Sequence, residues 1–199
     1  MYSLTVKVIG SSQFKSSCIS YLLLTLLFGS GNSLTMERDF HAGLMNATVQ
    51  CHMPKACDVP GFKDWFKVGL HCVKYFNNTL NFTEAEFSCI DSTRGAHLAS
   101  VHNASDNNHL LCIVKKFNPT NRRVWIGGFR LLQSHRFLWL DGSAWNYDEW
   151  VPGEPNHNFT NEECVELNWK EHGKWNDKSC FVEKSYICAF EAKRIVKEE

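Results

Sequence analysis

The pattern of apolar and polar positions divides the chain into a helical part followed by a strand-rich part. Residues 34–56 show no sustained period, which predicts an irregular N-terminal arm. The segment 69–76 has valine and aromatic residues around a cysteine, as in a β-strand. A helix of about ten residues is predicted after it, because Thr83 and Glu86 have capping-box spacing and Gly95 marks the end.

A second helix is predicted from the N-cap Ser105 to a point before Pro119. Four apolar residues at spacing i, i+3, i+4 and i+7 form a stripe that should be buried: Leu110, Ile113, Val114 and Phe117. Cys112 lies off this stripe, where a free thiol would be exposed. We therefore expect Cys112 to form a disulfide with another segment, with the N-terminal arm favoured.

From Val124 onwards the pattern changes to short β segments separated by turn residues such as Asp141 and Gly142. These segments are 124–129, 137–140, 164–169 and 185–190. In the third segment Val165, Leu167 and Trp169 alternate with polar residues, which predicts a half-buried strand. Helices first and antiparallel strands later indicate an α+β domain.

Composition changes this picture little. The 199 residues are 44% apolar, enough for one domain with a real core, and 21 basic residues balance 21 acidic ones. The balance excludes a strongly basic nucleic-acid surface or a polybasic membrane anchor. No H-E-x-x-H, G-x-S-x-G or phosphate-loop motif occurs, so no enzyme is expected. Strand contexts predict core positions for six tryptophans: Trp125, Trp139, Trp145, Trp150, Trp169 and Trp175.

The N-terminus has the order of a secretory signal peptide. Lys7 and Lys15 precede an apolar run of about 12 residues, 18–29, and the small and polar residues 30–33 follow it. The run is well short of the roughly 20 residues that span a bilayer, which disfavours a membrane anchor. We expect residues 1–33 to be removed and the protein to be secreted into the extracellular space.

Cysteines and glycosylation sequons agree with secretion. The chain has nine cysteines, and removal of Cys18 with the leader would leave eight, an even number suited to four disulfides. No Cys-x-x-Cys spacing occurs, which disfavours zinc. Five asparagines begin predicted N-glycosylation sequons: Asn46, Asn77, Asn81, Asn103 and Asn158.

The stretch EPNHNFTNEECVELNWKEHGKWND, residues 154–177, crowds carboxylates and amides into a short region. Carboxylates held close repel one another unless a cation compensates them. Calcium is the natural cation, because it binds about six to eight oxygen ligands. Five residues here offer only oxygen-type donors to a metal: Glu154, Asn156, Glu162, Asn176 and Asp177. Coordination positions would stay open for the oxygens of a ligand.

From about Cys57 to Phe190 the sequence resembles the C-type lectin-like domain family. The motifs are GAHLASVH (95–102), WIGGF (125–129), LDGSAWNYDEW (140–150), EPN (154–156) and WND (175–177). Small fish lectins and type II antifreeze proteins of this family share the compact one-domain layout. Together with the residue pattern, the resemblance predicts four regions: signal peptide 1–33, arm 34–56, lectin domain 57–190 and charged tail 191–199.

The resemblance implies a double-loop α+β fold with two helices and antiparallel β-sheets, stapled by disulfides. It pairs Cys89 with Cys188 and Cys164 with Cys180. In the longer form of the domain, Cys72 is one end of a disulfide that closes an N-terminal hairpin. Either Cys57 or Cys51 is the other end, and the one left over bonds Cys112 or a second subunit.

In the family, the five oxygen donors named above match the ligands of the sugar-binding calcium site, and the Glu154–Pro155 peptide is expected to be cis. Each of two neighbouring sugar hydroxyls binds calcium, donates to a carboxylate and accepts from an amide. EPN resembles the version that selects mannose-type sugars, whereas the galactose version reads Gln-Pro-Asp. His157 stands where a second calcium site often has an acidic residue, so one calcium is expected.

The implied function is calcium-dependent binding of glycans that carry mannose, glucose, N-acetylglucosamine or fucose, in innate immune recognition. A glycan on Asn158 would crowd the bound sugar. The alternative is the same scaffold used as an ice-binding or protein-binding module without sugar binding. We expect no nucleic-acid partner and no membrane anchor. Weak single sites predict a homo-oligomer, disulfide-linked or non-covalent.

Overall fold

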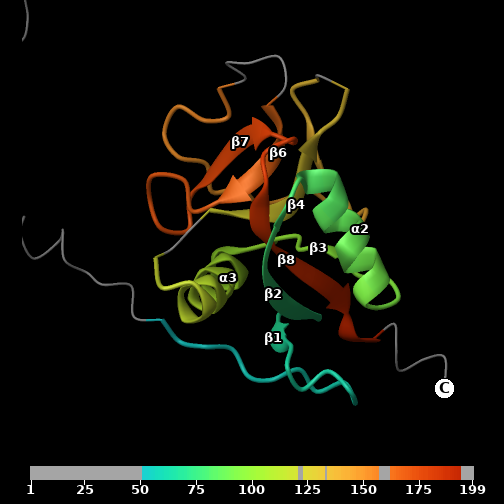
Figure 1. Ribbon diagram of the computed structural model, residues 1–199. Coiled ribbons are helices and arrows are strands. Elements are labelled where there is room, and N and C mark those ends of the chain that lie inside the picture. The colour runs from blue at the N-terminus through green and yellow to red at the C-terminus, as the bar shows by residue number, and fades with distance from the viewer. Residues whose placement is uncertain (1–50, 121–122, 133, 157–161, 194–199) are drawn as a thin grey trace, which may run out of the picture. The chain divides into compact units, whose positions relative to one another are not determined.

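A computed structural model describes residues 51–120, 123–132, 134–156 and 162–193. The predicted signal peptide, most of the N-terminal arm, Asn46, His157 and Asn158 lie outside these residues. Within them, eight strands and two helices form the fold (Figure 1). No helix of the described residues is long and apolar enough to cross a membrane.

The strands and helices follow the predicted order. Their bounds are β1 Phe66–Val68, β2 His71–Leu80, α2 Phe82–Ser92, β3 His97–Leu98, α3 Ala104–Phe117, β4 Val124–Arg130, β5 Phe137–Trp139, β6 Glu162–Leu167, β7 Trp175–Ser179 and β8 Lys184–Glu191. The main strand order is β1-β2-β8-β4-β6-β7, with β3 paired to β8 and β5 paired to β4. All of these pairs are antiparallel except β4 with β8, which is parallel. The α+β prediction is confirmed, with a mixed sheet in place of a purely antiparallel one.

Helix α2 begins two residues earlier than the sequence pattern predicted. Its N-cap is Asn81, whose side chain accepts from the backbone N–H of Glu84, while the Glu84 side chain accepts from the N–H of Asn81. This is a capping box, but with Asn81 in place of Thr83. Both residues have a carboxylate three positions later, and asparagine caps at least as well as threonine.

Helix α3 also uses an asparagine as its cap. The Asn103 side chain accepts from the N–H of Asp106, so the predicted cap Ser105 lies inside the first turn. The helix ends at Phe117, before Pro119, as predicted. Leu110, Ile113 and Val114 are buried as the stripe requires, whereas Phe117 at the end of the helix is 47% exposed.

The two core clusters lie on the faces of the sheet and use most of the predicted tryptophans. Trp125, Trp139 and Trp175 are almost fully buried. Trp145 and Trp150 are partly exposed and pack against the cluster that contains Trp139 and Trp175, whereas Trp125 belongs to the other cluster. Trp169 lies beyond the end of β6, so the predicted alternation stops at Leu167. The strand is not half-buried, because Glu166 on its polar face is fully buried as well.

Four disulfides hold the described part of the chain. They are Cys51–Cys112, Cys57–Cys72, Cys89–Cys188 and Cys164–Cys180. The first two resolve the alternatives that the sequence left open, because the arm cysteine Cys51 bonds helix α3 and Cys57 closes the hairpin. All eight cysteines of the described residues are therefore bonded within one chain.

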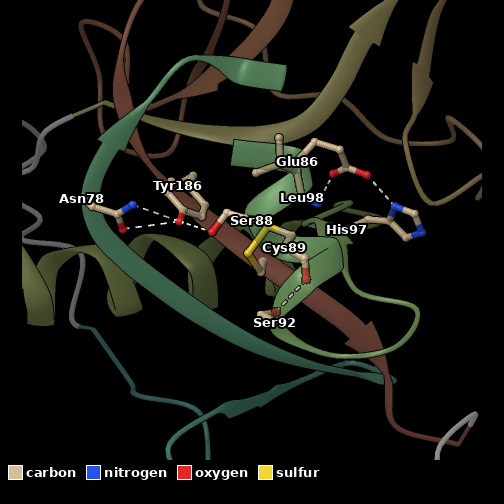
Figure 2. The surroundings of a disulfide bond; sticks show 9 residues. Asn78, Glu86, Ser88, Cys89, Ser92, His97, Leu98 and Tyr186 are labelled. Atoms are coloured by element: carbon tan, nitrogen blue, oxygen red, sulfur yellow. Dashed lines mark hydrogen bonds and ion pairs between the residues drawn. A yellow bond between two sulfur atoms is a disulfide. The ribbon is translucent and has the colours of Figure 1, made fainter. Parts of the chain in front are cut away.

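Helix α2 is fastened around its disulfide by a second set of contacts, which Figure 2 shows. The Glu86 carboxylate accepts from the backbone N–H of Leu98 at 2.8 Å and contacts the His97 ring nitrogen Nδ1 at 2.6 Å. On the other side, the Ser88 hydroxyl lies 2.6 Å from the Tyr186 hydroxyl. These contacts join α2 to β3 and β8, so the polar side chains of Glu86 and Ser88 find partners within the protein.

Candidate functional site

The loop that carries EPN is tied to strand β7 by backbone hydrogen bonds. The N–H of Trp175 donates to the carbonyl of Glu149 at 2.8 Å, and the N–H of Val151 donates to the carbonyl of Trp175 at 3.0 Å. The indole of Trp150 packs edge-on against that of Trp175, at 5.9 Å between centroids. The N–H of Glu154 then donates to the carbonyl of Val151 at 2.9 Å, which turns the chain. EPN is thus held beside the WND motif.

One contact joins the two motifs directly. The Asp177 carboxylate accepts a hydrogen bond from the backbone N–H of Asn156 at 3.3 Å, across 21 positions of sequence. The Glu154–Pro155 peptide is cis, as the resemblance implied. Asp177 is fully buried, whereas Asn156 is exposed. The pair therefore runs from the interior to the surface.

Glu154 is placed at an electrostatic cost. Its Oε2 is buried and has no hydrogen-bond partner among the described residues. Burial raises the pKa of Glu154, and the negative charges of Asp177 and Glu162 raise it further, while the N–H of Asn156 partly opposes this. Glu154 thus lies within electrostatic range of two other predicted ligands.

Glu162 opens strand β6 and is only 4% exposed. Its Oε1 accepts from the ammonium of Lys178 at 2.7 Å. Lys178 follows Asp177 on strand β7, and the sequence analysis did not assign it a role. The contact between Lys178 and Glu162 depends on the pairing of strands β6 and β7, so the sequence alone does not show it.

Asn176 is a predicted ligand whose side chain contacts Glu166, which is not one of the five predicted ligands. It is paired with Glu166 in the register of β6 and β7, whereas Asp177 is paired with Val165. Side chains alternate along a strand, so Asn176 and Asp177 leave β7 on opposite faces. The amide Nδ2 of Asn176 donates to Glu166 Oε1 at 2.8 Å.

Glu166 is the centre of a buried ionic network that the sequence analysis missed. Its Oε1 also lies 3.3 Å from Nη1 of Arg123, and its Oε2 lies 2.9 Å from Nζ of Lys184. Burial lowers the pKa of Lys184, and the charge of Glu166 opposes that shift. The signal in the sequence was a glutamate inside a predicted strand, which had been assigned to a solvent-facing side.

The donors fit calcium in kind but are not gathered into a cage. Carboxylate and amide oxygens are the ligands that calcium takes, and the buried Oε2 of Glu154 is an oxygen that a cation would satisfy. Among the described residues, however, no three His, Cys, Asp or Glu side chains lie close enough together to form a metal-binding group. Binding would therefore require the carboxylates to move towards one ion.

Three of the predicted glycosylation asparagines can be placed. Asn77 and Asn103 are exposed, and Asn81 is partly exposed at its helix cap. Asn77 also lines a pocket of about 490 Å³ together with Arg123 and Trp169, and none of the five predicted calcium ligands lines this pocket. Trp169 is partly exposed, and the Arg123 guanidinium lies 4.5 Å from the centre of its ring, so it is not a core residue.

The Lectin C-type domain family matches residues 78–190, more than half of the chain. This chain belongs to the C-type lectin family. The match spans helices α2 and α3, strands β3 to β7, nearly all of β8, and the EPN and WND motifs. It agrees with the resemblance identified from the motifs. The C-type lectins are carbohydrate-binding proteins and not enzymes, so glycans are the expected class of partner.

Two relatives of similar identity differ in the sugar that their descriptions name. The galactose-specific lectin nattectin of Thalassophryne nattereri is 35% identical over 64% of this chain and 78% of its own length. A mannose-binding C-type lectin isoform of Oxyuranus scutellatus is 38% identical over 63% of this chain and 80% of its own. The sugar must therefore be argued from the site.

A solved structure bears on the motif itself. The structure of the EPNH mutant of CEL-I matches with a TM-score of 0.60 and 28% identity, covering 63% of this chain and 93% of that one. Residues 154–157 of this chain have the same four letters, Glu-Pro-Asn-His. In that protein the four letters are the product of a mutation, so the match shows that the fold accommodates them.

Proposed function

We propose that this protein is a calcium-dependent lectin for mannose-type sugars. The observation that carries the proposal is the buried Oε2 of Glu154, which lies in a field of negative charge from Asp177 and Glu162. A cation would relieve this repulsion, and oxygen donors of this kind favour calcium. The EPN motif and the membership of the family support the same assignment.

The residues have separate tasks in this proposal. Glu154, Asn156, Glu162, Asn176 and Asp177 would hold the ion, which would supply a positive centre for two sugar hydroxyls. Glu154 and Glu162 would accept the hydroxyl protons, and the amides of Asn156 and Asn176 would donate to the hydroxyl oxygens. Asp177 already orders the backbone of Asn156 through its hydrogen bond.

Sugar choice follows from the order of acceptor and donor in EPN. With the acceptor Glu154 first and the donor Asn156 second, the site suits neighbouring equatorial hydroxyls, as in mannose, glucose, N-acetylglucosamine and fucose-containing glycans. Recognition of such glycans on foreign surfaces, an innate immune role, is the setting that we propose. We also propose a lectin domain at residues 57–190 and a cleaved leader at residues 1–33, as expected from the sequence.

Secretion is part of the proposal. Four disulfides within one chain are typical of proteins that fold in an oxidising compartment. A single site that holds two hydroxyls buries little of its ligand, so useful affinity for a surface requires several sites together. We therefore propose a homo-oligomer, and the bonded state of the described cysteines favours a non-covalent one.

The experiment is retention on immobilised mannose and galactose, with calcium and with chelator. Retention on mannose that a chelator abolishes is the expected result. Retention that ignores the chelator would refute the calcium site, and retention on galactose alone would refute the sugar assignment. No retention on either sugar, with calcium bound, would favour the use of the scaffold as a protein-binding or ice-binding module.

A further inference from the structure

Asn176 is the predicted calcium ligand that the structure connects to the interior of the protein. Its Nδ2 donates to Glu166 Oε1 at 2.8 Å, and both residues are buried, at 4% and 0% exposure. A carboxylate has acceptors only, so it can receive the NH2 end of an amide but not the oxygen end. Glu166 therefore determines which way round the Asn176 amide lies.

This orientation matters because the two ends of the amide have different uses. With one N–H bound to Glu166, the carbonyl oxygen lies on the other side of the amide group, and that oxygen is the atom a calcium ion would take. The NH2 group has two hydrogens, so a second N–H is left for a sugar hydroxyl. A reversed amide would offer calcium a nitrogen.

Glu166 is itself held in place by its cations. Lys184 lies 2.9 Å from Oε2, with its side chain 5% exposed, and Arg123 lies 3.3 Å from Oε1 and stacks on Trp169. A carboxylate fixed from two sides has little freedom to turn, so its hydrogen bond to Asn176 is directional. Partners of this kind orient metal ligands, and their loss commonly lowers metal affinity about 10- to 100-fold.

We propose that Glu166 is a positioning residue for the calcium site: it fixes the Asn176 amide with its oxygen available to the ion and one N–H available to the sugar. This inference rests on the proposed function of the same site. It assigns a calcium-related role to a residue that contacts neither the ion nor the sugar. It also explains why a fully buried glutamate lies within a strand of the sheet.

The first test is Glu166→Gln in the full chain, with calcium affinity measured by calorimetry in the absence of sugar. A glutamine can present either end to Asn176, so the orientation is no longer selected, and calcium affinity should fall about tenfold or more. Glu163→Gln is the matched control, because it removes the same charge from the same strand, where Glu163 lies 3.8 Å from Arg130. We expect the control to stay within about twofold of the wild type, since the Glu163 side chain is 34% exposed and is not one of the five predicted ligands.

The second test exchanges donor and acceptor. In Glu166→Gln with Asn176→Asp, the glutamine amide can donate to the aspartate and leave a carboxylate oxygen for calcium. Calcium affinity should return to within about threefold of the wild type, while binding of methyl mannoside stays lost because aspartate has no N–H for the hydroxyl. This split between calcium and sugar is not expected from a residue that only stabilises the fold.

A third readout concerns orientation alone. Without calcium, the side-chain NH2 signals of Asn176 in a ¹⁵N-labelled wild type should show one slowly exchanging proton, and Glu166→Gln should remove this protection. The inference is overturned if folded Glu166→Gln keeps its calcium affinity, if Glu163→Gln loses as much, or if the exchanged pair binds calcium no better than Glu166→Gln. A wild type that takes no calcium also overturns it. A wild type that takes calcium but no mannoside counts against the sugar assignment alone.

Discussion

The two ends of strand β6 carry two buried glutamates in opposite electrostatic states. Glu166 is surrounded by Arg123, Lys184 and the amide of Asn176, so the protein supplies its own compensation. Glu162 has one lysine, Lys178, and its negative charge helps to raise the pKa of Glu154, whose Oε2 is buried without a hydrogen-bond partner among the described residues. At the first end the charges of the protein compensate one another, whereas the second end is where the proposed calcium would add positive charge.

The difference separates charges that stabilise the fold from charges that are available to bind a cation. Compensated charges hold the β6, β7 and β8 strands together, and their removal should weaken the fold. Carboxylates that repel one another store unfavourable energy that a bound cation can release. The same residue type on one strand therefore serves two purposes, and the surroundings decide which.

The largest expected effect is on the free energy of unfolding when each of the two glutamates is replaced by alanine, measured in the presence of a calcium chelator. Glu166→Ala leaves Lys184 buried without its carboxylate, so the free energy of unfolding should fall by about 3–5 kcal/mol. Glu162→Ala leaves Lys178, whose side chain is 30% exposed, and should cost about 1 kcal/mol or less. Urea unfolding monitored by tryptophan fluorescence measures both. Equal losses would break the comparison.

Calcium should stabilise the protein through the carboxylates at the second end. At a free concentration 100 times its dissociation constant, the ion should raise the free energy of unfolding by about 2.7 kcal/mol. Glu162→Gln should abolish this gain, since it removes a charged ligand. Glu163→Gln, the neighbouring residue on β6, should keep it. Thermal scans with and without calcium give the answer, and a gain that survives Glu162→Gln would exclude Glu162 as a ligand.

Exchange of EPN for the galactose-type motif should change sugar choice without loss of calcium. In Glu154→Gln with Asn156→Asp, the acceptor and donor trade places around the ion while the number of oxygen ligands is kept. Mannoside affinity should fall about tenfold or more, because two hydrogen bonds lose their partners. Galactoside affinity should rise by less. Competition with both methyl glycosides tests this, and an unchanged mannoside affinity would count heavily against the assignment.

The smallest effect concerns pH in the calcium-free protein. Burial and Asp177 raise the pKa of Glu154, so the folded state binds its proton more readily than the unfolded state does. The penalty from Glu154 is present at neutral pH and is relieved as pH falls through its raised pKa. Unfolding of the wild type and of Glu154→Gln at pH 7 and pH 5 measures this, and the gap between them should narrow on acidification. A gap that widens would mean that Glu154 is not crowded by negative charge.

With calcium bound, the sign is reversed. The ion favours the ionised carboxylates, so protons compete with it and acid should release both calcium and sugar. Elution from mannose by mild acid, with the disulfide-bonded fold retained by circular dichroism, is the expected result.

The fold and the site motifs could be predicted because their signals are local. Helix α3 was read from its apolar stripe, and the β segments from alternation and turn residues. The helix caps were misplaced by two positions. At α2, Asn81 and Thr83 both satisfy the same spacing rule, which does not select one of them. Local rules propose such alternatives and do not rank them.

The sequence by itself determined the family and the α+β class, and it provided five oxygen donors as candidate ligands, because these depend on residue types at fixed spacings. Only the tertiary structure decided that Cys51 bonds Cys112, that Lys178 contacts Glu162 and that Glu166 is buried among Arg123, Lys184 and Asn176. Each of these depends on the register of neighbouring strands or on the docking of distant segments. A charge is exposed or compensated by what lies across the sheet, and the order of residues along one strand carries no record of that.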